Sequence, residues 1–222
     1  MIGTEARSAR FWDRRAATYN KTEVDNQQLQ RTILERSLEY LGSDDITLDY
    51  GCGTGALSFE IAPHVKVLHG LDISPRMVEI ARDRADGYEL ENLRFSAASI
   101  FTDTLQPESF DVIFTSQVLH VMRDRDEALH RIYELVRPGG WFLSTTPCMP
   151  KGQSVMKVAN RALSMASAVR AISYMKFSSV DDLERSISEA GFEIHETADL
   201  QFDQRSDMRH VFARFVAARK IP

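Results

Sequence analysis

Apolar residues fall at helical spacing in the first part of the chain and form short strand-like runs after it. Residues 5–20 place aromatic residues among charged ones, which predicts a helix that then breaks. Residues 27–41 carry leucines and an isoleucine at helical spacing, with Gly42 as the expected C-cap. These two segments predict a helical N-terminal region that precedes the first strand.

Strand-like and helix-like segments alternate from residue 46 onward. The expected strands are Ile46–Tyr50, Lys66–Asp72, Leu93–Ala97, Phe110–Ser116, Trp141–Thr145, Phe192–Thr197 and Val211–Lys220. The expected helices are Ala56–Ala62, Pro75–Asp86, Arg125–Val136 and Val180–Ala190, with Ser74 as the N-cap of the second. Such alternation predicts an α/β fold, in which crossover helices connect the strands of a parallel sheet.

Composition excludes some classes of protein. With 222 residues, a net charge of −5 and a pI near 5.7, the chain has room for one well-buried domain and lacks the broad basic footprint of nucleic-acid binding. The cluster Arg7, Arg10, Arg14 and Arg15 is either a local basic patch or a solvated helix face.

Cysteine and histidine usage indicates a reduced compartment. Cys52 and Cys148 form no zinc-ligand spacing, and the six histidines form no metal-ligand pattern. The sequence has neither an apolar run long enough to span a membrane nor a signal-peptide pattern at its N-terminus. We therefore expect a cytoplasmic protein with no structural metal and no stable membrane insertion.

The most informative stretch is Leu48–Gly55, where an apolar strand ends at Asp49-Tyr50 and glycines alternate at 51, 53 and 55. Glycine allows a backbone to turn sharply and to approach a ligand closely. Gly51, Gly53 and Ala56 also fit the dinucleotide pattern G-x-G-x-x-G/A. Asp72 ends the next strand, where a carboxylate can accept both hydroxyls of a ribose, so an adenosine ligand is indicated. The alternative for Asp72–Pro75 is a turn that only caps a helix.

Further motifs follow in a fixed order along the chain. They are Trp12-Asp13 with Ala16 and Tyr19, the loop Asp49–Gly55, Leu71–Ser74, Ser109-Phe110-Asp111, Pro138-Gly139-Gly140 and Ala190-Gly191-Phe192. Together they resemble the class I S-adenosylmethionine-dependent methyltransferases, and within them the small-molecule type that includes quinone-biosynthesis enzymes. The resemblance covers roughly residues 10–220.

The resemblance implies a three-layer, doubly wound, Rossmann-like sandwich. Its sheet is seven-stranded and mostly parallel, with one antiparallel strand near the C-terminus. Residues 1–222 would form a single methyltransferase domain, with an N-terminal helical lid at about residues 1–42 and a helical cap over the acceptor at about residues 150–176. A helix that covers the sheet edge or a dimer contact is the alternative for the cap segment.

The resemblance also implies a binding site for S-adenosylmethionine and its product S-adenosylhomocysteine. The loop backbone of Gly51, Cys52, Gly53 and Gly55 would border the methionine part, with Asp49 near the amino group. Asp72 would hold the ribose. Ile73, Met77 and the backbone N–H groups of Ser99 or Ile100 would contact the adenine. Tyr19 would reach the cofactor carboxylate or the substrate mouth, and Ser116 would lie at the same site.

One departure from the family pattern concerns adenine recognition. Many relatives carry Gly-Asp-Ala after the third strand, and the acid contacts the adenine amino group. This chain has Ala97-Ala98-Ser99-Ile100 there, so no carboxylate stands at the matching position. Losing one such hydrogen bond costs about 1.5–3 kcal/mol if nothing replaces it.

Candidate residues for chemistry follow the fourth strand, in the segment Ser116–His120. Ligands of open α/β sheets bind outside the carboxyl ends of the strands, so this segment should face the transferred methyl group. Gln117 is a candidate for orienting the acceptor. His120 is a candidate base, because its ordinary pKa lies near 6.5. The alternative for His120 is a structural histidine.

We therefore expect an enzyme that transfers a methyl group to a small-molecule acceptor, mainly through proximity and orientation. The alternatives are a non-catalytic cofactor-binding module or scaffold and an NAD-dependent dehydrogenase. The expected partners are the acceptor alone, with no nucleic acid, for a monomer or homodimer. The sequence does not indicate which atom of the acceptor is methylated.

Overall fold

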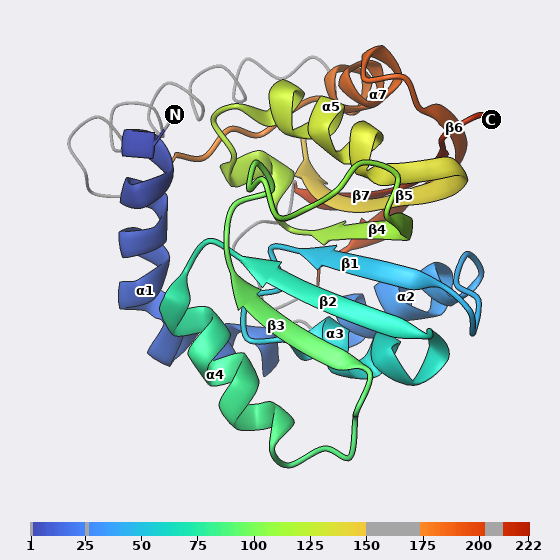
Figure 1. The fold of residues 1–222 in the computed structure, drawn as a ribbon. Helices are drawn as coiled ribbons and strands as arrows, with labels where there is room; N and C mark the ends of the chain where they lie inside the picture. The colour runs from blue at the N-terminus through green and yellow to red at the C-terminus, as the bar shows by residue number, and fades with distance from the viewer. Residues whose placement is uncertain (1, 25–26, 150–173, 203–210) are drawn as a thin grey trace.

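The computed structural model describes residues 2–24, 27–149, 174–202 and 211–222. These residues build a seven-stranded sheet of order β3-β2-β1-β4-β5-β7-β6 (Figure 1). The strands are β1 Ile46–Tyr50, β2 Val67–Asp72, β3 Leu93–Ala97, β4 Phe110–Ser116, β5 Val136–Cys148, β6 Glu193–Gln201 and β7 Phe212–Arg219. β7 runs antiparallel to both β5 and β6, whereas the pairs from β3 to β5 are parallel. The expected fold, with one antiparallel strand near the C-terminus, is confirmed.

Helices cover both faces of the sheet. They are α1 Ile2–Val24, α2 Gln27–Leu38, α3 Ala56–Ile61, α4 Pro75–Ala85, α5 Arg125–Leu135 and α7 Val180–Glu189, with 3₁₀ turns η1 Ala62–His64 and η2 Leu119–Val121. In Figure 1, α5 and α7 lie above the sheet, α2, α3 and α4 lie below it, and α1 stands beside the carboxyl ends of the first strands. Ser74 caps α4 as predicted, since its Oγ accepts a hydrogen bond from Met77 N at 3.2 Å.

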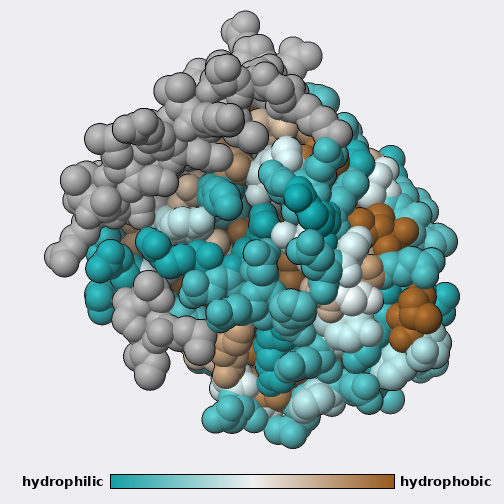
Figure 2. Space-filling model, turned by 90° about the horizontal axis from the view of Figure 1, so that it is seen from above, coloured by the Kyte–Doolittle hydropathy of each residue, from teal (hydrophilic) through white to brown (hydrophobic). Residues whose placement is uncertain are grey.

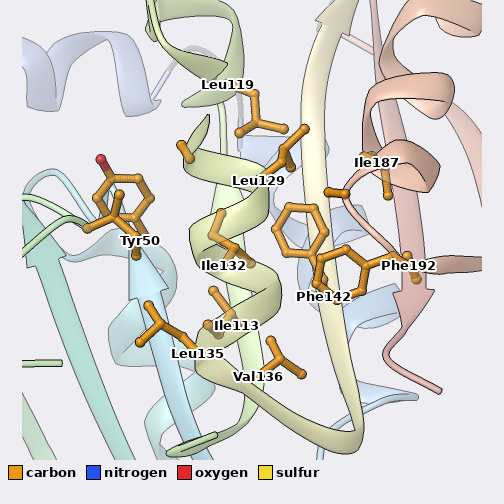
Figure 3. Close-up of a cluster of buried hydrophobic side chains, with 14 of the residues drawn as sticks. Tyr50, Ile113, Leu119, Leu129, Ile132, Leu135, Val136, Phe142, Ile187 and Phe192 are labelled. Atoms are coloured by element: carbon orange, nitrogen blue, oxygen red, sulfur yellow. The ribbon is translucent and has the colours of Figure 1, made fainter. Parts of the chain in front are cut away.

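Two hydrophobic clusters form the core, one on each face of the sheet. Neighbouring residues of a strand contribute to opposite clusters, because side chains alternate across a strand. Ile113 joins the cluster under α5 and α7, while Phe114 joins the cluster over α2, α3 and α4. In Figure 3 the rings of Phe142 and Phe192 lie together beside α5, with centroids 5.3 Å apart. This packing anchors the strands whose carboxyl ends carry the candidate site.

Several boundaries differ from the predicted ones. α1 is longer than the expected residues 5–20, and β6 extends to Gln201 instead of Thr197. α2 and β5 differ as well. α2 ends at Leu38, and Gly42 is not its C-cap; the Gly42 N–H instead donates to Asp45 Oδ2 at 2.7 Å. β5 begins at Val136 instead of Trp141, because Val136 already pairs with Phe110 of β4. The register between the two strands then shifts, and the next pair is Val112 with Trp141. The expected cap at residues 150–176 lies outside the described residues, except for 174–176.

The surface seen in Figure 2 is mainly hydrophilic where the structure describes it, with small, separate hydrophobic patches. Among the described residues, no helix is long and apolar enough to cross a membrane. The large apolar side chains that the structure describes as exposed are those of Tyr88 and Ile221.

Candidate functional site

A pocket opens at the carboxyl ends of the central strands, beside α1. It holds about 890 Å³ of empty space, open solvent at its mouth included. Four parts of the chain line it: α1, the ends of β1 and β2 with the loops after β1, β2 and β3, the first turn of α4, and the end of β4 with the segment after it. The lining residues are Glu5, Ser8, Trp12, Tyr19, Tyr50, Gly51, Gly53, Asp72, Ile73, Met77, Phe101, Ser116, Gln117, Val118, Val121, Met122, Arg123 and Asp124.

The glycine loop is held to the end of β2 by its own backbone. The N–H groups of Gly51 and Cys52 both donate to Leu71 O, at 2.6 and 3.2 Å. Gly53 has a φ of +55°, and a Cβ built on it would have, among the described residues, only the Tyr19 ring within 4 Å, at 3.5 Å. The loop therefore presents bare backbone to the pocket, which gives a ligand close access.

Asp72 lies beside this loop, with only 9% of its surface exposed. Its Oδ2 accepts a hydrogen bond from Gly53 N at 3.0 Å, and its Oδ1 accepts one from Ser74 N at 2.8 Å. Burial raises the pKa of Asp72 to about 6; the two N–H groups oppose the shift, and the charge of Asp13 adds to it. Each carboxylate oxygen keeps acceptor capacity, so the group can receive hydroxyl donors from a ligand.

α1 is fixed over the pocket by Asp13. Asp13 Oδ1 accepts hydrogen bonds from Ser74 Oγ at 2.6 Å and from Arg76 N at 3.1 Å. A carboxylate at this end of α4 is also favoured by the helix dipole. Trp12 and Tyr19, whose rings meet edge to face with centroids 6.2 Å apart, then form part of the pocket wall.

Gln117 follows β4 with a strained backbone. Its φ is +59°, in the left-handed region that non-glycine residues seldom adopt, and its N–H donates to Thr145 O at 2.8 Å. Its Nε2 is buried and has no hydrogen-bond partner among the described residues. Strained backbone and unpaired buried polar atoms both concentrate at functional sites, and Gln117 combines them at the pocket wall.

His120 lies on η2, just outside the pocket lining. Its ring stacks on Phe177 with centroids 6.2 Å apart, and its Nδ1 is buried without a partner among the described residues. Burial lowers the pKa of His120 to about 4, so the imidazole is neutral at physiological pH. Its carbonyl accepts a hydrogen bond from Lys176 N at 2.8 Å, which joins η2 to the chain before α7.

Five of the expected cofactor residues do not line the pocket. Asp49 is buried behind the loop, where its Oδ2 accepts a hydrogen bond from Ser58 Oγ at 2.6 Å and burial raises its pKa to about 7. Cys52 and Gly55 face the cluster of Phe59 and Phe95. The other two are Ser99 and Ile100.

Ser99 and Ile100 lie in the loop after β3. Ser99 Oγ donates to Glu5 Oε1 at 2.5 Å, and Ile100 is fully buried. Tyr19, Gly51, Gly53, Asp72, Ile73, Met77, Ser116 and Gln117 are the expected residues that the structure does bring together at one pocket.

Some pocket residues were not predicted. From α1 come Glu5 and Ser8, which are far from the glycine loop in sequence and carry no motif of their own. Trp12 belongs to the motif Trp12-Asp13 with Ala16 and Tyr19, and this motif could have indicated that Trp12 lies at the pocket. Val121, Met122, Arg123 and Asp124 line the pocket beyond the expected segment Ser116–His120. Among the described residues, no cluster of His, Cys, Asp and Glu could hold a metal ion.

Comparison with known proteins identifies relatives. A family model described as a methyltransferase domain matches residues 41–208. An uncharacterized methyltransferase of Schizosaccharomyces pombe is 28% identical over 193 residues, which is 83% of this chain and 71% of that protein. A ubiquinone biosynthesis O-methyltransferase of Coxiella burnetii is 29% identical over 99 residues. This match spans 45% of the chain and less than half, 42%, of that enzyme.

A solved structure with a similar fold is the geranyl diphosphate C-methyltransferase of Streptomyces coelicolor, in complex with Mg²⁺, geranyl diphosphate and S-adenosylhomocysteine. Its TM-score is 0.70 and its identity 14%, over 87% of this chain and 78% of that one. At this identity the likeness concerns the fold.

Proposed function

The chain belongs to the class I S-adenosylmethionine-dependent methyltransferase family, and from this premise we propose that it binds S-adenosylmethionine in the pocket beside α1 and methylates a small, partly apolar molecule. The observation that carries the proposal is the meeting of Gly53, Asp72 and Tyr19 at one pocket. Bare loop backbone next to a buried carboxylate suits a ligand that carries both a ribose and a charged amino-acid part.

The residues present fit this cofactor. Asp72 has acceptor capacity for the ribose hydroxyls, and Ile73 and Met77 supply apolar surface for the adenine ring. Asp49, one position before Tyr50, is buried behind the loop near the end that would hold the cationic amino-acid part. Burial raises its pKa to about 7, and a cation bound nearby would lower that pKa and favour the ionised form.

When bound, S-adenosylmethionine supplies an electrophilic methyl group, whose bond to the sulfonium sulfur breaks as the bond to the acceptor forms. The protein's part is to align the acceptor with that methyl group and to exclude water. α1, with Trp12 and Tyr19, covers the pocket. Val118, Val121 and Met122 supply apolar lining for the acceptor.

Gln117 orients the acceptor in this proposal. Its Nε2 is a donor that is buried without a partner among the described residues, and an acceptor oxygen would satisfy it. His120 is the candidate base for an acceptor that must lose a proton, since its neutral imidazole has a buried Nδ1 with no partner among the described residues. Its pKa of about 4 makes it a weaker base than the ordinary value near 6.5 would. His120 reaches the acceptor only from behind the lining residues, so Gln117 has the more direct role.

Calorimetric titration with S-adenosylmethionine, S-adenosylhomocysteine and NAD tests the proposal. We expect micromolar binding of the two sulfur ligands and none of NAD. Asp72→Ala should weaken binding by about 10-fold or more, because the ribose loses its acceptor. Asp83→Ala, at an exposed position of α4, is the matched control and should bind as the unaltered protein does.

The outcomes separate the alternatives. Binding of NAD alone would indicate a dehydrogenase and overturn the proposal. Binding of the sulfur ligands without turnover across a screen of phenols, carboxylic acids and isoprenoid acceptors would favour a non-catalytic module. A folded sample that binds neither sulfur ligand would contradict the cofactor assignment itself.

A further inference from the structure

The first turns of α1 place a carboxylate against the loop after β3. Ser99 Oγ donates to Glu5 Oε1 at 2.5 Å, across 94 positions of sequence. Ser99 Oγ in turn accepts a hydrogen bond from Phe101 N at 3.2 Å. The loop backbone, the serine and the glutamate thus form one connected chain, and both Glu5 and Phe101 line the pocket.

This carboxylate lies on the side of the pocket where the base of a nucleoside would lie. Asp72 and Ala97 are paired in the β2–β3 ladder, and Ala98 N donates to Asp72 O at 3.0 Å. A nucleoside whose ribose is held by Asp72 would therefore have Ile73 and the β3 loop within reach of its base. Among the described lining residues the carboxylates are Glu5, Asp72 and Asp124, and Glu5 is the one bonded to that loop.

Ala98 leaves the β3 loop without an acid of its own between Ala97 and Ile100. We propose that Glu5 supplies the missing carboxylate from α1 and accepts a hydrogen bond from the exocyclic amino group of the adenine. This inference rests on the proposed function, because it needs the adenosine of the cofactor in the pocket. Glu5 Oε1 accepts the hydrogen bond from Ser99. Among the described residues, no donor bonds to the other carboxylate oxygen, Oε2, so it can accept a hydrogen bond from the amino group.

An acceptor at this position selects the base. An ionised carboxylate accepts hydrogen bonds and donates none, so it favours an amino group and opposes the carbonyl oxygen that replaces it in hypoxanthine. The pair S-adenosylhomocysteine and S-inosylhomocysteine differs at this group. Recognition of the base also requires α1 to be docked, which ties cofactor selectivity to the position of the helix.

The test is calorimetric titration of both ligands into the unaltered protein and into Glu5→Ala, Glu5→Gln and Asp13→Ala. The unaltered protein should prefer the adenine ligand by about 10- to 100-fold. Glu5→Ala should lose most of that preference by weakening S-adenosylhomocysteine alone. Glu5→Gln, which keeps a carbonyl acceptor, should retain part of it. Asp13→Ala loosens α1, which carries Glu5, so it should weaken both ligands and also lower the preference for the adenine ligand, but less than Glu5→Ala does.

The proposal is overturned if Glu5→Ala changes the affinity for both ligands by the same factor, since Glu5 would then only fasten α1. It is likewise overturned if Glu5→Ala changes neither affinity, since Glu5 would then have no role in binding. Failure of the proposed function is distinguished from this by the unaltered protein, which would bind neither ligand.

Discussion

Ser74 Oγ donates a 2.6 Å hydrogen bond to Asp13 Oδ1, so the residue that caps α4 also holds α1 in place. The backbone of Ser74 also contributes to the pocket, because its N–H donates a hydrogen bond to Asp72 Oδ1. One serine therefore connects α1, α4 and the carboxylate proposed for the ribose.

Asp13→Ala should weaken the binding of S-adenosylhomocysteine by about 5- to 10-fold, because two hydrogen bonds that fix α1 are lost. Global stability should fall by only about 1 kcal/mol, since most of the core lies elsewhere. Titration calorimetry and urea denaturation measure the two effects. Unchanged affinity would mean that α1 does not contribute to binding.

Gly53→Val should abolish cofactor binding and leave the protein folded. The valine side chain would enter the pocket and take the space of the cofactor. The main cost to the folded state would be the backbone strain of a valine at a φ of +55°. Gly55→Val is the contrasting change, because a Cβ there would lie 2.8 Å from Phe95 and 2.9 Å from Phe59 in the core. Circular dichroism with a ligand titration should show a binding defect for the first and a folding defect for the second.

Ligand affinity and stability should respond to pH in opposite directions between pH 4 and pH 6. Because the pKa of Asp72 is raised to about 6 from the ordinary 3.8, the native state keeps a proton that the unfolded chain has already released. The contribution of this group to stability is therefore greatest below pH 4 and is lost as pH rises to 6, by about 3 kcal/mol. S-adenosylhomocysteine, whose ribose donates to the ionised carboxylate, should bind more tightly over the same range.

Denaturation and titration series at pH 4–7, for the unaltered protein and for Asp72→Asn, check this behaviour. The difference between the two proteins isolates Asp72 from the other carboxylates. Parallel pH profiles would show that Asp72 ionises with its ordinary pKa in the folded protein.

Gln117→Ala should lower kcat/KM for the acceptor by about 10-fold while the affinity for S-adenosylhomocysteine stays the same. The substitution removes a donor that is buried without a partner among the described residues, and it leaves the glycine loop untouched. Steady-state kinetics with a competent acceptor provide the measurement. A loss of cofactor affinity instead would place Gln117 against the cofactor.

His120→Ala should slow turnover and leave cofactor affinity unchanged if the acceptor loses its proton to this imidazole. Because the pKa of His120 is lowered to about 4, kcat should not fall as pH decreases from 7 to 5. Activity that survives the substitution would support methyl transfer by proximity and orientation alone.

The sequence predicted the fold well because the alternation of apolar strand-like runs and helix-like runs is local and repeats along the chain. Leu93–Ala97 and Phe110–Ser116 have the bounds that their apolar runs indicated, and Ser74 caps α4 as a serine before Pro75 should. The end of α2 and the start of β5 were wrong. Gly42 bonds to Asp45 within its own loop instead of capping the helix, whereas long-range pairing sets the start of β5. Val136 joins the sheet through Phe110, a partner that no local pattern of residues 125–145 reveals.

The candidate site was predictable where a residue belongs to the glycine loop or ends a strand, as Gly53 and Asp72 do. It was not predictable where the fold brings distant segments together. Glu5 meets Ser99 across 94 positions of sequence, and the pattern around residue 5 only predicts a helix. The hydrogen-bond partners of Asp72 likewise depend on the closed geometry of two loops.

The chain has two tryptophans, and they lie in different surroundings. Trp12 lines the pocket, whereas Trp141 packs on β5 beside Tyr40 and His195, with ring centroids 4.8 and 5.3 Å away. In a Trp141→Phe variant the remaining indole would emit from the pocket wall itself. The protein thus contains its own fluorescent reporter of occupancy, which can follow ligand entry in time without a label.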